Sequence, residues 1–173
     1  MMPRVPINLP IQSAVLRPLA LALLCSLAFA GAANAAELRG RVVGIADGDT
    51  LTLLTDQREQ VRIRLAEIDT PERRQPYGDR ARQALAALTF GRAVEVEVVD
   101  TDRYGRTVGR VRAGAEDVNA ELVRRGAAWV YRRYSRDPSL LRLEDDARAA
   151  RRGLWALPAA ERVPPWEWRA ARR

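Results

Sequence analysis

The sequence contains no lysine and no histidine, so all 29 of its basic residues are arginine. Without histidine, Ser-His-Asp and Cys-His nucleophilic catalysis, zinc sites built on imidazole and nucleases with a histidine base are excluded. Without lysine, a Walker A phosphate loop and Schiff-base chemistry are excluded as well. Any catalysis by this chain must therefore depend on carboxylates, arginine, hydroxyl groups, the backbone and, if one binds, a metal ion.

Cysteine is almost as scarce, since Cys25 is the only one among 173 residues. It lies within the uncharged run of residues 19–30, which follows two arginines and precedes small residues at 33–36. A positively charged start, a short apolar run and small residues at its end are typical of a secretory signal peptide. Because the run is shorter than the about 20 apolar residues of a membrane span, we expect residues 1–35 to be removed. A retained anchor is the alternative.

Such a signal peptide predicts a periplasmic or secreted protein with no stable membrane span after cleavage. Cleavage removes two arginines and leaves 27 against 22 acidic residues, a net charge of +5. The mature chain has no cysteine and therefore needs no disulfide in an oxidising compartment. Its positive charge is consistent with nucleic acid as substrate, bound through phosphates with little sequence preference and a strong dependence on salt.

Alternation of apolar and charged residues predicts five strands. Two of them lie within residues 39–55, and the others at 60–68, 92–100 and 107–112. Apolar residues at helical spacing, each run followed by a glycine, predict helices at 79–90, 118–125 and 139–152. For residues 36–157 we predict an α+β fold, a five-stranded OB-fold-like β-barrel with three helices packed outside it.

Residues 158–173 form a basic C-terminal tail rich in tryptophan and arginine. Such a tail can stack on bases or bind an anionic surface. Alternatively, its tryptophans pack on the barrel and its arginines are solvated.

Acidic residues and arginines concentrate in three short segments at 47–50, 64–72 and 102–106. Each segment suits a turn or the start of a helix, because Asp-Gly forms hairpin turns, Asp caps helices and Gly adopts positive φ. Turn formation does not explain why five positions should all be charged. These positions are Asp49, Arg64, Asp69, Glu72 and Arg106.

Phosphodiester cleavage without histidine or lysine would need the residue types that these segments supply. Two carboxylates with carbonyl and water oxygens can hold a hard divalent cation, which acts as a Lewis acid on a phosphate oxygen. A third carboxylate can orient and deprotonate water. Arginines can hold the remaining phosphoryl oxygens through bidentate hydrogen bonds. The sequence contains one candidate for each role.

The segments resemble, in order, spacing and residue type, the signature segments of the thermonuclease (staphylococcal nuclease-like) family. They are Asp47-Gly48-Asp49-Thr50, then Arg64 followed five residues later by Asp69-Thr70-Pro71-Glu72, and last Asp102-Arg103-Tyr104-Gly105-Arg106. The helix expected at 118–125 is similar to the helix that follows the barrel in that family, and the segment Gly153-Leu154-Trp155 is similar to the C-terminal end of the family's domain. The resemblance covers about residues 39–155.

The resemblance implies a Ca²⁺-dependent phosphodiesterase that acts on DNA and RNA and leaves 3′-phosphate ends. Asp49 and Asp69 match side-chain ligands of the Ca²⁺, and Thr70 matches a ligand that binds through its backbone carbonyl. Asp47 matches a nearby acid with a supporting role.

The same resemblance implies roles for the remaining charged residues. Glu72 matches the general base, or the residue that positions the attacking water, and Arg64 and Arg106 match contacts to the phosphate and transition state. Arg103 and Tyr104 match the neighbourhood of the nucleotide's terminal phosphate. Tyr134, and less securely Tyr131, match aromatic residues that pack on the base or sugar.

A secreted nuclease, expected to be a monomer, is therefore the main hypothesis. The alternative is a non-catalytic OB-fold nucleic-acid-binding module, because one fold hosts many functions. A binding module has no need to keep all five charged residues named above, and none of them is missing here. A structural protein with an incidental Ca²⁺ site would explain neither Arg64 nor Arg106.

Overall fold

The computed structural model describes residues 36–172. The expected signal peptide, residues 1–35, and the last residue lie outside the described residues. Within the described part of the chain, no helix is long and apolar enough to cross a membrane.

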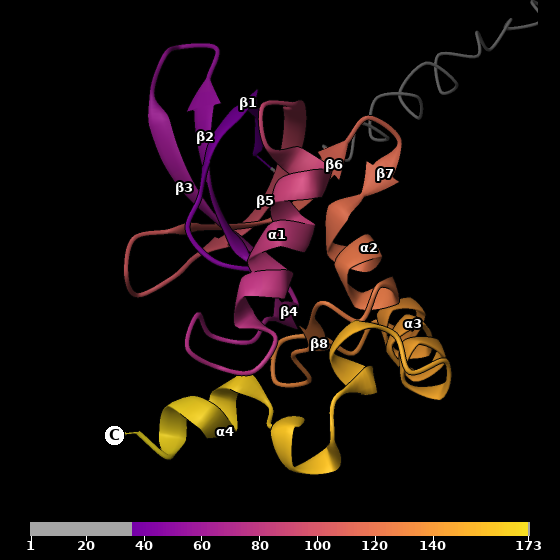
Figure 1. Cartoon of the computed structure of the whole chain (residues 1–173). Helices are drawn as coiled ribbons and strands as arrows, with labels where there is room; N and C mark the ends of the chain where they lie inside the picture. Colours follow the sequence, from indigo (N-terminus) through magenta and orange to yellow (C-terminus); the bar gives the residue numbers. More distant parts are fainter. Residues whose placement is uncertain (1–35, 173) are drawn as a thin grey trace, which may run out of the picture. The chain divides into compact units, whose positions relative to one another are not determined.

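Five strands close into a barrel (Figure 1). They are β1 (Glu37–Ile45), β2 (Thr50–Thr55), β3 (Gln60–Leu65), β5 (Ala93–Thr101) and β6 (Thr107–Ala113). Antiparallel pairing follows the order β3-β2-β1-β5-β6, and a parallel pairing between β3 and β6 closes the ring. The predicted α+β fold with an OB-fold-like barrel is confirmed.

The barrel interior is filled by the apolar members of the alternating patterns. Ile63 and Leu65 on β3 are fully buried, whereas Arg62 between the strand's apolar residues is exposed. Leu51 and Leu53 on β2 are fully buried as well. Burying one such side chain contributes roughly 1.5–3 kcal/mol, so the pattern that predicted the strands also determines which face points inward.

Helices cover one side of the barrel (Figure 1). They are α1 (Gly78–Thr89), α2 (Val118–Arg124) and α3 (Pro138–Ala149), and each overlaps the range predicted for it. The helix α1 contacts β1 and α2, and α2 contacts α3 and β6. Two short 3-10 helices, Gly153–Ala156 and Ala159–Glu161, follow α3.

The run predicted as one strand at 60–68 is divided in two. Glu67 has a φ of 65°, a left-handed conformation that ends the extended run after Leu65. The chain then forms β4 (Ile68–Asp69), which pairs with β8 (Trp129–Val130) in a separate two-stranded sheet. A further short strand, β7 (Glu116–Asp117), pairs with β6. The turn at Glu67 therefore takes Asp69 out of strand β3 and places it in the two-stranded sheet with β8.

A fourth helix, α4 (Pro165–Ala170), lies in the C-terminal tail, where the sequence predicted none. It begins at a proline, a residue that suits the first helical position because its missing N–H would have no partner there. Trp166 of α4 stacks on Tyr131, with ring centroids 5.1 Å apart and planes at 2°, and meets the edge of Trp129 at 5.9 Å. The tail therefore packs on the domain through Trp166, in partial agreement with the second alternative, but Arg169 is paired with Asp69 and Glu72 and is not simply solvated.

Candidate active site

The loop between β1 and β2 places Asp47 and Asp49 at one end of the barrel. Asp47 Oδ1 accepts a hydrogen bond from the backbone N–H of Asp49 at 3.1 Å. Between them, Gly48 lies so close to the next segments that a Cβ would come within 2.7 Å of Thr70 Oγ1 and 2.8 Å of Ala81 Cβ. A residue without a Cβ is needed here, because the loop packs directly against the segment that carries Asp69.

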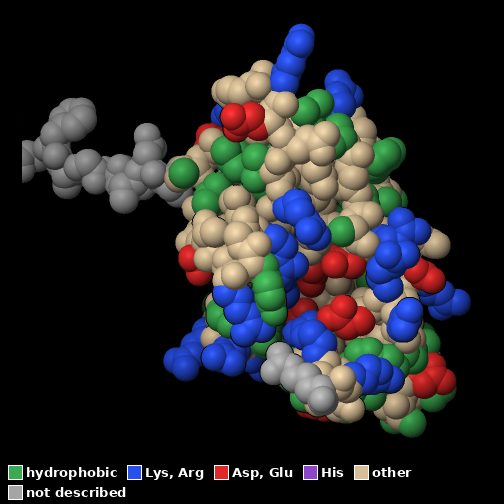
Figure 2. All heavy atoms as spheres, turned by 90° about the vertical axis from the view of Figure 1, so that its left-hand side faces the viewer, with side chains coloured by type: hydrophobic (Ala, Val, Ile, Leu, Met, Phe, Trp, Pro, Cys, Tyr) green, Lys and Arg blue, Asp and Glu red, His purple; other side chains and the backbone are tan. Residues whose placement is uncertain are grey.

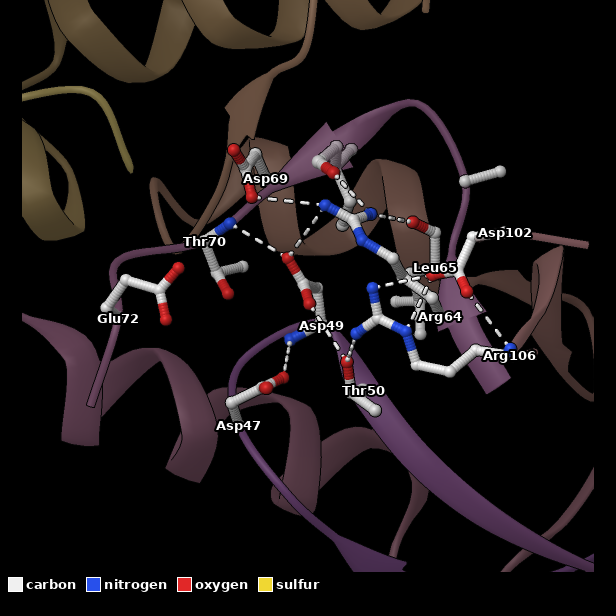
Figure 3. Close-up of polar contacts among 12 residues, drawn as sticks. Asp47, Asp49, Thr50, Arg64, Leu65, Asp69, Thr70, Glu72, Asp102 and Arg106 are labelled. Atoms are coloured by element: carbon white, nitrogen blue, oxygen red, sulfur yellow. Dashed lines mark hydrogen bonds and ion pairs between the residues drawn. The ribbon is translucent and has the colours of Figure 1, made fainter. Parts of the chain in front are cut away.

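Two buried carboxylates, Asp49 and Asp69, are joined by Arg64 (Figure 3). Nη2 of Arg64 lies 3.1 Å from Asp69 Oδ1 and 3.6 Å from Asp49 Oδ2. Asp49 Oδ2 also accepts from the backbone N–H of Thr70 at 3.1 Å. The structure thus brings together the three predicted metal ligands and one predicted catalytic arginine.

Burial makes the carboxylates of Asp69 and Asp47 hard to keep charged. It raises the pKa of Asp69 to about 6, an effect that the charge of Asp49 reinforces and the guanidinium groups of Arg169 and Arg64 oppose. Burial, together with the charge of Asp49, also raises the pKa of Asp47 to about 6. Carboxylates crowded together away from water attract a cation, because a nearby positive charge favours their ionised form.

Arg64, on β3, and Arg106, in the turn immediately before β6, both reach this end of the barrel. The parallel register aligns Arg64 with Val108, two residues after Arg106. Nη1 of Arg64 donates to the backbone carbonyls of Leu65 and Ile68 at 2.9 and 3.1 Å. These contacts leave its side chain only 16% exposed.

Arg106 is held at the edge of the site by partners on both sides. Its Nε and Nη2 each lie 2.7 Å from Asp102 Oδ2, and its Nη1 donates to Thr50 Oγ1 at 3.3 Å. The guanidinium is therefore fixed in direction by the β5–β6 turn and by the first residue of β2 (Figure 3).

Glu72 follows β4 in the loop that leads to α1. Its backbone N–H donates to Gln75 Oε1 at 3.1 Å, and the first residue of α1, Gly78, lies so close that a Cβ would overlap the Glu72 carbonyl. These contacts fix the backbone while the carboxylate stays partly exposed on the side of Thr70 and Asp49 (Figure 3).

The sequence did not predict that Arg169, in the C-terminal tail, belongs to this site. Its Nη1 lies 2.7 Å from Glu72 Oε1 and 3.2 Å from Asp69 Oδ1, and its Nη2 lies 2.7 Å from Asp69 Oδ2. A usable signal was present in the tail, because Trp166 and Arg169 are three residues apart behind a proline. On a helix, that spacing puts an aromatic anchor and a charge on one face.

The comparison with known sequence families decides the identity of this domain. Residues 62–157 match the family described as staphylococcal nuclease homologue. The chain belongs to the staphylococcal nuclease family. The match includes Arg64, Asp69, Glu72 and Arg106, whereas Asp49 precedes it and Arg169 follows it.

Curated relatives of this staphylococcal nuclease-like protein agree. It is 52% identical to "Protein ParB" of Escherichia coli over 145 residues, covering 78% of this chain and 80% of that protein. It is 45% identical to "Micrococcal nuclease" of Shigella flexneri over 147 residues, covering 79% and 83%. It is 47% identical to "Uncharacterized endonuclease" of Escherichia coli O157:H7 over 135 residues, covering 78% and 86%. The protein is a hydrolytic nuclease of this family, and its substrate is nucleic acid.

Nucleases of the staphylococcal nuclease family are generally metal-dependent, and the donor set here fits a hard cation. Among the described residues, no three or more His, Cys, Asp or Glu side chains are grouped closely enough to hold a metal ion. Asp49 and Asp69 instead supply two carboxylates on adjoining segments, next to Thr70. Oxygen donors suit Ca²⁺ or Mg²⁺, which complete their coordination with carbonyl and water oxygens.

The predicted substrate-binding residues of the nuclease lie on two sides of the site. Tyr104 is exposed, with the guanidinium of Arg103 4.8 Å and that of Arg106 5.6 Å from its ring centroid. Tyr134 is exposed as well, but it contacts Tyr131, at 4.9 Å between rings. No contact within the described residues joins Tyr134 to the carboxylates. The structure therefore brings Arg103 and Tyr104 to the site's edge and leaves Tyr134 apart from it.

The surface of the nuclease is hollowed at this end. Figure 2 shows acidic side chains within the hollow and arginines around it. A pocket of about 530 Å³ adjoins Arg106, and its lining residues come from β3 and the β5–β6 turn: Gln60, Val61, Arg62, Tyr104, Gly105 and Arg106. Arginines around a group of carboxylates are the arrangement expected where a polyanion binds next to a cation that those carboxylates hold.

Proposed function

We propose that this protein is a secreted, monomeric, calcium-dependent nuclease that hydrolyses phosphodiester bonds of DNA and RNA with little sequence preference and leaves 3′-phosphate ends. The observation that carries the proposal is the pair of buried carboxylates, Asp49 and Asp69, with Arg64 between them and Glu72 beside them. Neither a binding module nor a structural protein requires two carboxylates in so costly an environment.

In this proposal, Asp49, Asp69 and the backbone carbonyl of Thr70 would hold the Ca²⁺. The bound ion would supply Lewis-acid polarisation of a phosphate oxygen. Glu72 accepts a proton from the attacking water, a role that suits it because its carboxylate is partly exposed and water can reach it, whereas Asp49 and Asp69 are buried.

The two arginines bind the phosphoryl group and stabilise the charge that develops on it. Asp102 and Thr50 fix the direction of the Arg106 guanidinium before substrate arrives. Such preorganisation is the basis of electrostatic catalysis, and loss of one such donor costs about 3 kcal/mol of transition-state stabilisation. Arg64 acts next to Asp49 and Asp69, the proposed metal ligands, with which it already forms ion pairs. Arg103 and Tyr104 contact the nucleotide at the edge of the pocket, and Tyr134 packs on a more distant base or sugar.

Secretion is proposed from the pattern of residues 1–35. Expression in a bacterium that exports proteins, followed by mass spectrometry of the periplasmic or released protein, tests it. A mature chain that begins near Ala36 is expected, and a protein that keeps its first 35 residues in the cell would contradict it.

Cleavage assays test the reaction. Purified mature protein is incubated with single-stranded DNA, duplex DNA and RNA in Ca²⁺, in Mg²⁺ or in a chelator, and the ends are analysed with a 3′-phosphatase. Cleavage in Ca²⁺ that stops on chelation is expected, with phosphatase-sensitive 3′ ends. Binding without cleavage would favour the non-catalytic OB-fold module. Cleavage that continues in the chelator would show that the reaction does not depend on a metal ion.

Glu72→Gln tests the base. It should lower kcat by at least about 10²-fold while the thermal unfolding curve stays close to that of the native protein. Glu59→Gln is the matched control, since Glu59 is an exposed carboxylate before β3. Near-native turnover of the Glu72 variant would remove Glu72 from the mechanism.

A further inference from the structure

We propose that Arg169 holds the Asp69 and Glu72 carboxylates when no cation is bound, and that the metal must displace it to bind. Arg169 is then a positioning residue of the site that determines its affinity for metal. The inference rests on the proposed metal dependence, and it concerns a residue beyond the family match at 62–157.

The contacts of Arg169 occupy the oxygens that a cation needs. Its two terminal nitrogens reach both oxygens of Asp69, at 3.2 and 2.7 Å, in the parallel arrangement typical of strong guanidinium–carboxylate pairs. Nη1 also reaches Glu72 Oε1 at 2.7 Å. Since Asp69 Oδ1 accepts from Arg64 as well, guanidinium groups cover both oxygens of this carboxylate.

Anchors outside the carboxylate cluster hold α4 over the site. Trp166 stacks on Tyr131 and meets the edge of Trp129. Gln75 donates to the backbone carbonyl of Val163 at 2.5 Å and accepts from the Glu72 N–H through its other amide atom. A side chain held in this way competes with the cation for the carboxylates at a high effective concentration, because it belongs to the same chain.

Asp69 already contacts two guanidinium groups, those of Arg64 and Arg169, and a dication cannot join both of them in so buried a place without strong repulsion. Arg169 is the arginine that can leave. Its side chain is 36% exposed, so it can turn into water without burying an unpaired charge. Arg64 is 16% exposed and bonded to two backbone carbonyls, so it stays in place. Arg169 therefore raises the cation concentration at which the metal site fills.

Calorimetric titration of Ca²⁺ into the metal-free protein tests this competition. Arg169→Gln should bind Ca²⁺ about tenfold more tightly than the native chain, because an internal competitor has been removed. Arg172→Gln is the matched control. It removes the same charge next to the same helix, but Arg172 lies on the Trp168 ring, 3.3 Å from its centroid, so the affinity should stay within about twofold.

Arg169→Lys adds a conservative variant. It keeps the charge and loses the planar fork, so an affinity between those of the native and Gln proteins is expected. If Arg169→Gln fails to fold, the comparison of the Lys variant with the native chain decides the question alone. Thermal unfolding gives an independent readout: Ca²⁺ should raise the Tm of the Gln variant more than that of the native protein.

Equal Ca²⁺ affinities for the native and Arg169→Gln proteins would overturn the inference and leave the proposed function standing. An equal gain in Arg172→Gln would overturn it too, because net charge would then explain the effect. Absence of Ca²⁺ binding in all variants, with cleavage insensitive to chelators, would instead refute the proposed metal dependence and this inference with it.

Discussion

The hydroxyl of Thr50 links Arg106 to Asp49, although Thr50 and Arg106 are 56 residues apart. Nη1 of Arg106 donates to Thr50 Oγ1 at 3.3 Å, and the same hydroxyl donates to Asp49 Oδ1 at 3.2 Å. Thr50 is fully buried at the start of β2. A hydroxyl can accept and donate at once, so this residue connects a phosphate-binding candidate to a metal-binding candidate.

Thr50→Val should therefore weaken both the site and the fold. Valine has the same shape but leaves Arg106 and Asp49 each without one partner, which we expect to cost about 1–3 kcal/mol of stability. The misplaced guanidinium should lower kcat about tenfold. Thr52→Val, on the same strand, is the control and should change neither. Steady-state kinetics with chemical unfolding measures both, and unchanged kcat in the Thr50 variant would show that the link has no functional role.

Arg106→Lys should lower kcat by about 10²-fold, although the charge is kept, because a lysine ammonium cannot reproduce the fork that Asp102 and Thr50 hold. Arg112→Lys, further along β6 and exposed, should leave turnover unchanged. Kinetics over a range of substrate concentrations separates kcat from KM. A rise in KM alone would indicate that Arg106 binds the substrate without acting on the transition state.

Gly48→Ala should disturb the Asp47–Asp49 loop. The new methyl group would lie against Thr70 and Ala81 at distances below normal contact, so either the loop or α1 must move. We expect a loss of about 1–3 kcal/mol in the free energy of unfolding and weaker Ca²⁺ binding by calorimetry. Gly44→Ala is the control, since its Cβ would meet only the Thr52 side chain at 3.3 Å. Native-like metal affinity in the Gly48 variant would contradict the packing argument.

Acid stability should depend in part on Asp137, the residue that caps α3. Hydrogen bonds from Ser139, together with Arg110, lower the pKa of Asp137 to about 2. Because the folded-state pKa lies below the unfolded value, the stabilisation is complete above about pH 4 and is lost as the pH falls through about 2.

The variant Asp137→Asn keeps a capping side chain and loses the charge. It should be less stable than the native protein at pH 6 by about 1 kcal/mol, a figure reduced for screening by solvent. The difference should shrink as the pH approaches 2. Urea unfolding over this pH range measures it, with Asp145→Asn on the exposed face of α3 as control. A difference in the free energy of unfolding that stays constant with pH would show that the geometry of the cap, and not the charge of Asp137, causes the stabilisation.

Much of the fold was predictable because its signals are local. Alternation in residues such as Val61, Ile63 and Leu65 indicated a strand, and glycines after the apolar runs indicated where helices end. The boundary at Glu67 was missed, although Val61, Ile63 and Leu65 alternate only as far as Leu65 and the charged Glu67 stands where the next apolar residue would fall. Helix α4 was missed because its six residues are too few to show a periodic pattern.

By itself, the sequence determined the strands, the three longer helices and the identity of the charged residues in three short segments, since residue type and spacing are local properties. Only the tertiary structure decided which of those residues meet. The parallel pairing of β3 with β6 brings Arg64 and Arg106 to one end of the barrel, and that pairing depends on closure of the whole sheet. Packing of Trp166 on Tyr131 places Arg169 on Asp69, 100 residues away in the chain. Contacts between distant segments depend on how the folded surfaces fit, and no local pattern encodes that fit.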